Sequence, residues 1–196
     1  MLKDKLKDYR IILASGSPRR QQFMKDLDLD FEIRLSDVDE VYPDSLKSTE
    51  ITDFLAELKA SALTDTLVPN EILITSDTIV WHEDKALGKP KDYDDAFNML
   101  MSLSGKTHEV ITSVCIRTTL KSNTFNQTTR VTFNTLTEDE VKYYLNNYKP
   151  YDKAGAYGIQ EWIGLVAIAN VDGSYVNVVG MPVDKVYQHL KTFATP

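Results

Sequence analysis

The sequence predicts a mixed α/β fold, with helices flanking a mixed sheet, in a single domain that spans residues 1–196. Two observations predict it. Apolar runs typical of strands alternate with segments whose apolar residues recur at helical spacing. A β-rich stretch between residues 108 and 136 then interrupts this alternation. The order of elements is too irregular for a simple doubly wound sheet.

The first strand and helix follow from a short apolar run and the proline after it. Residues 10–15, RIILAS, are typical of a buried strand. Ser17 is a candidate helix cap, and Pro18 suits the first helical position. One face of the expected helix carries three apolar residues, Phe23, Met24 and Leu27.

The next elements continue the alternation of strand and helix. Residues 31–36, FEIRLS, alternate in polarity like a strand. A helix is expected where four apolar residues keep helical spacing: Ile51, Phe54, Leu55 and Leu58. Residues 71–81, EILITSDTIVW, predict a strand or a pair of strands, and residues 94–103, DDAFNMLMSL, predict a helix after a proline-containing loop.

The second half begins with two β-rich segments, residues 108–118 and 124–136, which we expect to be antiparallel neighbours. Residues 137–140, TEDE, form a capping box in which Thr137 caps the helix and Glu140 reaches back. The helix that follows should turn four residues toward the core: Val141, Tyr144, Leu145 and Tyr148.

The C-terminal part holds one ambiguous segment and one clear helix. Residues 157–179 have strand propensity, but glycine and asparagine interrupt it, so the secondary structure of this segment is uncertain from the sequence. The last helix is predicted from four apolar residues at helical spacing: Val183, Val186, Tyr187 and Leu190.

Composition narrows the classes of function. The net charge of −7 opposes general binding to nucleic acid or to an anionic membrane, so an anionic ligand would need a local basic pocket. The single cysteine, Cys115, excludes an intrachain disulfide, and the three histidines lack zinc-site spacing. The first residues do not resemble a signal peptide, and no apolar run is long enough to span a membrane. A cytoplasmic protein is therefore expected.

The stretch LASGSPRR, residues 13–20, has the features of an anion site. The start of a helix exposes N–H groups and carries a partial positive charge. Gly16 lets an anion approach the backbone, and Ser15 and Ser17 add hydroxyls. Arg19 and Arg20 add forked donors that match phosphate oxygens. The alternative is an ordinary capped helix with two solvated arginines.

A second candidate site lies in SDTIVWHEDKALGKP, residues 76–90. Asp77 follows an apolar run, so we expect it at the end of a strand, where its carboxylate must be solvated, paired or metal-bound. Lys89 follows twelve residues later, and a carboxylate and a lysine in one place suit a metal–phosphate site. Alternatively, Asp77 caps a turn and Lys89 is a surface residue.

The stretch SGKT, residues 104–107, resembles the end of a Walker phosphate loop but lacks its context. That motif needs a glycine five positions before Gly105, where this chain has Leu100, and it leads into a helix rather than a strand. We interpret it as a turn between a helix and a strand.

Taken together, the motifs identify a resemblance to the Maf family of nucleoside triphosphate pyrophosphatases. They run along nearly the whole chain in the family's order: LASGSPRR, DVDE, LAELKA, SDTIV, LGKPKDYDDA, LSGKTHEVITSV, KAGAYGIQ and GSYVNVVGMP. One departure is Ser76, where the family usually has alanine. The resemblance implies a two-lobed fold with a central cleft, similar to inosine-triphosphate pyrophosphatases, and metal-assisted hydrolysis of a nucleoside triphosphate to monophosphate and pyrophosphate.

Position by position, the resemblance also implies roles for residues. Asp77 matches the catalytic acidic residue, and Glu40 matches an acidic residue beside the phosphate site. Both are candidate ligands of Mg²⁺ or Mn²⁺. Three positions match residues associated with substrate choice: Arg19, Thr78 and Gln160. Three others match basic residues of the phosphate site: Arg20, Lys59 and Lys89. Three of these residues have alternative interpretations. Glu40 could belong to an acidic surface loop, Lys59 to a solvated helix face, and Gln160 could stabilise its own loop.

The motif KAGAYGIQ resembles the branch of the family that acts on dTTP and UTP, and a homodimer is compatible with the resemblance. Two rival functions stay open. One is a non-catalytic nucleotide-binding regulator of septum formation, which should lack a catalytic carboxylate or a phosphate-site base. The other is a purine-directed house-cleaning pyrophosphatase, against which the motifs SGSPRR and KAGAYGIQ count.

Overall fold

The computed structural model describes residues 1–193, which divide into two compact units. Unit 1 holds residues 1–77 and 112–127 together with the C-terminal residues from Gly180, and unit 2 holds residues 78–111 and 128–179. The strands form a sheet in the order β2-β1-β3-β5-β6-β7, with β4 paired to β3. Parallel and antiparallel pairs both occur, so the predicted mixed α/β fold with flanking helices is confirmed.

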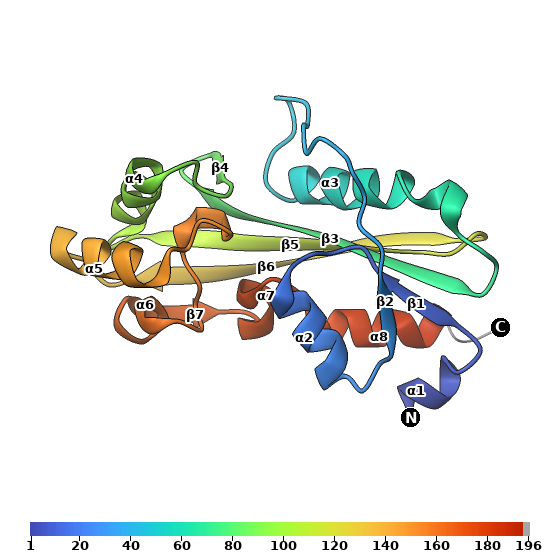
Figure 1. The fold of residues 1–196 in the computed structure, drawn as a ribbon. Coiled ribbons are helices and arrows are strands. Elements are labelled where there is room, and N and C mark those ends of the chain that lie inside the picture. The colour runs from blue at the N-terminus through green and yellow to red at the C-terminus, as the bar shows by residue number, and fades with distance from the viewer. Residues whose placement is uncertain (194–196) are drawn as a thin grey trace. The chain divides into compact units, whose positions relative to one another are not determined.

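Unit 1 is built on the parallel strands β2, β1 and β3 (Figure 1). Ile12 on β1 lies opposite Glu32 on β2 and Leu73 on β3. The elements of this unit are α1 (Leu2–Lys5), β1 (Arg10–Leu13), α2 (Pro18–Asp26), β2 (Phe31–Ile33), α3 (Thr49–Ser61), η1 (Thr64–Thr66), α8 (Val183–Phe193), the first part of β3 (Glu71–His82), and parts of β5 (Thr107–Arg117) and β6 (Ser122–Phe133).

Both faces of the unit 1 strands are covered by helices. Ala56 and Ala60 of α3 pack with Ile12 and Leu73 on one face, where the small alanines let the helix approach closely. The opposite face carries Leu13 and Ile74 and packs with Met24 of α2 and Leu190 of α8. Figure 1 shows α3 and α8 on opposite sides of these strands. Adjacent residues of a strand point to opposite faces, so two short apolar strands support two layers of core.

Unit 2 has its own core, formed by residues such as Leu100 of α4, Val141 of α5 and Phe133 of β6. Its hairpin pairs β3 with β4 in antiparallel register, with Val80 opposite Leu87. Besides the remaining parts of β3, β5 and β6, its elements are β4 (Lys85–Leu87), α4 (Tyr93–Leu103), α5 (Glu138–Tyr148), η2 (Ala154–Ala156), α6 (Trp162–Val166), β7 (Ile168–Asp172) and α7 (Tyr175–Val179).

Most sequence-based assignments of elements are confirmed. β5 and β6 are neighbours in the sheet, and a connection of four residues joins them, so they must run antiparallel. The capping box of α5 is formed as predicted, with Thr137 Oγ1 accepting from Glu140 N. The stretch SGKT lies between α4 and β5, so the turn assignment is also confirmed.

Four expectations were wrong or incomplete. Asp77 lies inside β3 rather than at its end, and Tyr148, the last residue of α5, is 39% exposed rather than turned toward the core. Ser17 occupies the N-cap position of α2, but its side chain makes no capping bond. The ambiguous residues 157–179 contain α6, β7 and α7 rather than one element.

Some expectations are not tested by this structure. Within residues 1–193, we find no helix with the length and apolar character needed to cross a bilayer. The single domain over residues 1–196, the central cleft, the homodimer and the cytoplasmic location stay predictions.

Candidate active site

Strand β3 extends beyond the end of its neighbour β1, and Asp77 lies in this extension. The last bond between these strands is from Ala14 N to Ile74 O (2.9 Å), and β3 runs on to His82. The antiparallel pairing with β4 begins only at Val80. Asp77 therefore lies in a stretch of β3 that pairs with neither β1 nor β4, while β5 is the other neighbour of β3 in the sheet. This explains why an apolar run followed by a polar residue did not mark a strand end.

The Asp77 carboxylate is buried, with 6% of the residue exposed, and its charge is balanced by Lys59 of α3. Lys59 Nζ lies 2.6 Å from Asp77 Oδ1 and 3.0 Å from Glu40 Oε1. A buried carboxylate is costly unless it is paired and hydrogen-bonded. One ammonium group thus joins both predicted acidic residues, and the alternative of a solvated helix face for Lys59 does not hold.

Arg20 is held in unit 1 by oxygens from three segments of the chain. Its Nε donates to Gly180 O at 2.9 Å, and its Nη1 donates to Ser76 O at 2.9 Å and to Ser15 Oγ at 3.4 Å. Burial lowers the pKa of the Arg20 guanidinium, whereas the negative charge of Asp77 raises it. Arg20 is therefore a fixed positive charge near Asp77, not a solvated arginine.

The remaining predicted residues of LASGSPRR lie at the start of α2. Ser15 is buried, and its Oγ accepts from Ser17 N at 3.3 Å as well as from Arg20. Ser17 and Arg19 are half-buried at the N-cap and in the first turn. The two arginines are close enough that Arg19 lowers the pKa of Arg20. Unit 1 therefore brings together Ser15, Arg19, Arg20, Glu40, Lys59 and Asp77.

Ser76 shows what the departure from the usual alanine does. The residue is 1% exposed, and its Oγ has no hydrogen-bond partner among the described residues. Its carbonyl oxygen, which any residue type would supply, accepts from Arg20. The hydroxyl therefore leaves the contact of Arg20 unchanged and adds a buried polar atom without compensation.

Thr78, Lys89 and Gln160 belong to unit 2. Thr78 is half-buried in β3 directly after Asp77, whereas Lys89 is exposed in the loop between β4 and α4. Gly155 N donates to Gly88 O at 3.0 Å, so the segment that carries Lys89 contacts the segment that leads to Gln160. The structure brings these two segments together, while the joint action of the three residues with the unit 1 group stays a prediction.

Gln160 is exposed, and within residues 1–193 its amide has no hydrogen-bond partner. A residue that stabilised its own loop through its side chain would show such a bond. The amide is instead available to a ligand.

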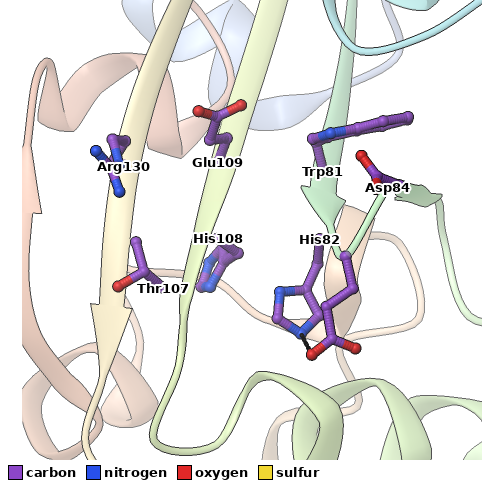
Figure 2. A pocket seen from close by; sticks show the side chains of 8 residues that line it. Trp81, His82, Asp84, Thr107, His108, Glu109 and Arg130 are labelled. Atoms are coloured by element: carbon purple, nitrogen blue, oxygen red, sulfur yellow. Dashed lines mark ion pairs between the residues drawn. The ribbon is translucent and has the colours of Figure 1, made fainter.

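A separate hollow of about 310 Å³ lies in unit 2 (Figure 2). No predicted site residue lines it, and its walls carry Glu83, Asp84 and Glu109 against the single cation Arg130. Such a lining repels a polyphosphate. His108 also borders it, and burial lowers the pKa of this imidazole to about 3, so it is neutral at physiological pH. This hollow is therefore unsuited to the predicted substrate.

Three residues near Gln160 were not singled out from the sequence as functional. Tyr144 was expected only as a core residue, and Lys153 and Glu161 were not assigned. In the structure, the Tyr144 hydroxyl contacts the Glu161 carboxylate, and Lys153 Nζ lies 3.0 Å from Glu161 Oε1. A tyrosine at a core position needs a partner for its hydroxyl, and that signal could have pointed to this group.

The comparison with solved structures concerns the fold class. The structure of the Ham1 protein of Staphylococcus aureus matches it with a TM-score of 0.55 at 16% identity, covering 94% of this chain and 99% of that chain. At this identity, the match shows the α/β fold class and no more.

The family follows from the sequence comparison. The model of the family described as Maf-like protein matches residues 10–193, and the chain belongs to that family. The dTTP/UTP pyrophosphatase of Flavobacterium johnsoniae is 64% identical over 98% of this chain and 99% of that protein. The dTTP/UTP pyrophosphatase of Flavobacterium psychrophilum is 62% identical over 97% of both chains.

Proposed function

We propose that this protein hydrolyses nucleoside triphosphates, with dTTP and UTP preferred, to the monophosphate and pyrophosphate. The observation that carries the proposal is the unit 1 group, in which Lys59 lies between the carboxylates of Asp77 and Glu40, close to the fixed guanidinium of Arg20. The names of the two Flavobacterium relatives support the reaction and the two substrates.

The charges of the group suit a polyphosphate. Arg19, Arg20 and Lys59 bring three cations into a protein whose net charge is −7. The two carboxylates offset part of this charge, and the start of α2 adds N–H groups that phosphate oxygens accept from. Lys89 of unit 2 is proposed to add a fourth cation.

Asp77 is the residue that we assign to the reacting water. Its Oδ1 accepts from Lys59, which leaves Oδ2 to orient a water molecule and take its proton as the water attacks the α-phosphorus. Lys59 and Arg20 then hold the negative charge that develops on the pyrophosphate leaving group. Arg20 is suited to this because its own bonds fix it before substrate binds.

A divalent cation fits the carboxylates of this group. Glu40 and Asp77 both contact the Lys59 ammonium, so their two carboxylates lie close to each other. No set of three or more metal-binding side chains occurs in the part of the chain that the structure describes. Mg²⁺ keeps several waters and is bound through one or two carboxylates plus substrate phosphates, and this group offers two carboxylates. When bound there, the ion would neutralise phosphate charge during hydrolysis.

The test is a panel of UTP, dTTP, CTP and GTP with Mg²⁺ or Mn²⁺, in which pyrophosphate and orthophosphate are measured separately. We expect pyrophosphate as the product, and the highest kcat/KM for UTP and dTTP. Release of orthophosphate with a nucleoside diphosphate would contradict the reaction. Equal kcat/KM for all four substrates would contradict the base preference alone.

A further inference from the structure

Gln160 is presented on a tight turn. Glu161 N donates to Gly158 O at 3.0 Å, which closes a β-turn with Ile159 and Gln160 as its central residues. The side chain of Gln160 is exposed, while Gly158 and Ile159 are buried. The position of the amide therefore depends on how firmly this turn is held.

The hydroxyl of Tyr144 forms hydrogen bonds with the residues at both ends of the turn. Gly158 N donates to Tyr144 Oη at 3.0 Å, and the Tyr144 hydroxyl donates to Glu161 Oε2. The direction is fixed because the N–H can only donate and the phenol has a single proton. Burial and the neighbouring Glu161 carboxylate raise the pKa of Tyr144, so this proton is present at physiological pH.

Lys153 contacts the second oxygen of the Glu161 carboxylate. Its Nζ lies 3.0 Å from Glu161 Oε1 and 2.8 Å from Asp152 Oδ1, and 10% of its side chain is exposed. The Lys153 ammonium thus pairs with the same carboxylate that accepts from Tyr144.

A side chain at Gly158 would crowd these groups. A Cβ at this position would lie 2.9 Å from Glu161 Cδ, and 3.0 Å from both Lys153 Cε and Gln160 Nε2. The side chains of Lys153 and Glu161 thus close over the turn that carries Gln160.

We propose that Tyr144, Lys153 and Glu161, here called the Gln160 clamp, are positioning residues that fix the Gln160 amide for base recognition, an inference that rests on the proposed function. Uracil and thymine present an N–H donor beside a carbonyl acceptor. The amide pairs with that edge in one orientation and with cytosine in the flipped one. A turn held at both ends fixes the backbone position from which the Gln160 amide reaches the edge of a pyrimidine base.

The test compares the ratio of kcat/KM for UTP to kcat/KM for GTP, whose larger base places its edge elsewhere, in the wild type, Tyr144→Phe and Lys153→Met. Both changes keep most of the side-chain volume and remove the polar contact with Glu161. We expect the ratio to fall by about fivefold or more in each variant, because a misplaced amide loses its hydrogen-bond match to uracil. The activity on GTP should change less than that on UTP.

Matched controls come from the neighbouring positions of α5. Tyr143 is exposed, and Lys142 forms an exposed pair with Glu138. Tyr143→Phe and Lys142→Met make the same chemical changes away from the clamp and should keep the ratio within about twofold of the wild type. Val131→Ala, in the core of unit 2, lowers stability without touching the clamp and should also keep the ratio.

The outcomes separate the two proposals. If both clamp variants lower kcat/KM equally for all bases, as Val131→Ala would, the clamp is only structural and the inference is wrong. If Lys153→Met does not fold, as judged by circular dichroism, the ratio in Tyr144→Phe decides. If the wild type itself releases no pyrophosphate from UTP, it is the proposed function that fails.

Discussion

Lys59 is the residue around which the charges of the candidate active site are arranged. Its ammonium contacts Asp77 at 2.6 Å and Glu40 at 3.0 Å, and 12% of its side chain is exposed. Arg20 adds a second fixed cation through bonds to Ser76 O and Gly180 O. The sequence alone supplied Asp77, Lys59 and Arg20 through the resemblance, but it did not show that a lysine on α3 bridges two carboxylates. That contact joins residues far apart in the chain and depends on packing.

The assignment of Asp77 is tested by Asp77→Asn. The change is nearly isosteric but removes the negative charge that takes the proton from water, so kcat should fall by at least about a hundredfold. Circular dichroism should show an unchanged fold. Asp65→Asn, at an exposed carboxylate of η1, is the matched control and should leave kcat unchanged. Turnover close to that of the wild type in folded Asp77→Asn would remove Asp77 from the mechanism.

Base recognition by Gln160 is tested by Gln160→Glu. A carboxylate has no N–H for the base carbonyl, so kcat/KM for UTP and dTTP should fall by about fivefold or more. The values for CTP and GTP should fall less. A uniform fall across the four triphosphates would instead assign Gln160 to the fold or the phosphates.

The N-termini of α2 and α5 differ in whether a side chain caps the helix, and this difference predicts unequal effects of mutation on stability. Thr137 Oγ1 accepts from Glu140 N, whereas the side chain of Ser17 makes no capping bond to α2. Thr137→Ala should therefore lower the free energy of unfolding by about 1 kcal/mol. Ser17→Ala should change it by less than about 0.5 kcal/mol.

Urea unfolding of both variants checks this difference. An equal loss of stability in the two proteins would contradict the account of their caps.

Elements with one dominant local signal could be predicted from the sequence. The helix α5 begins at its capping box, and the buried strand β1 is marked by its apolar run. Other features depend on tertiary pairing. Asp77 lies inside β3 because β3, which also neighbours β5, continues beyond the end of β1 at Leu13, and nothing local to Asp77 signals this pairing. Residues 157–179 divide into short elements because the turn at Gly158 is held by Tyr144, which lies fourteen positions earlier.

At the scale of the whole molecule, one buried ion pair makes stability depend on pH. Glu71, at the start of β3, accepts bonds of 2.8 and 3.0 Å from the guanidinium of Arg34, which follows β2. Hydrogen bonds from Arg34 lower the pKa of Glu71. A lowered pKa in the folded state stabilises the protein fully above the ordinary pKa of glutamate, and this contribution is lost as the pH falls through the lowered value.

Glu71→Gln should therefore lower the free energy of unfolding by about 1–3 kcal/mol at neutral pH. The difference from the wild type should shrink as the pH falls below the ordinary pKa of glutamate, because Glu71 takes up a proton first in the unfolded chain and then in the folded one. Urea unfolding of both proteins across this pH range measures it. A difference that stays constant with pH would show that the charge of Glu71 does not stabilise the fold.

The central claim, that water attacks the α-phosphorus and pyrophosphate leaves, is tested most directly by hydrolysis of UTP in water enriched in ¹⁸O. The account predicts that one ¹⁸O atom appears in the uridine monophosphate and none in the pyrophosphate, as read by mass spectrometry of both products. Appearance of ¹⁸O in pyrophosphate, or in orthophosphate beside a nucleoside diphosphate, would place the attack at another phosphorus and contradict it.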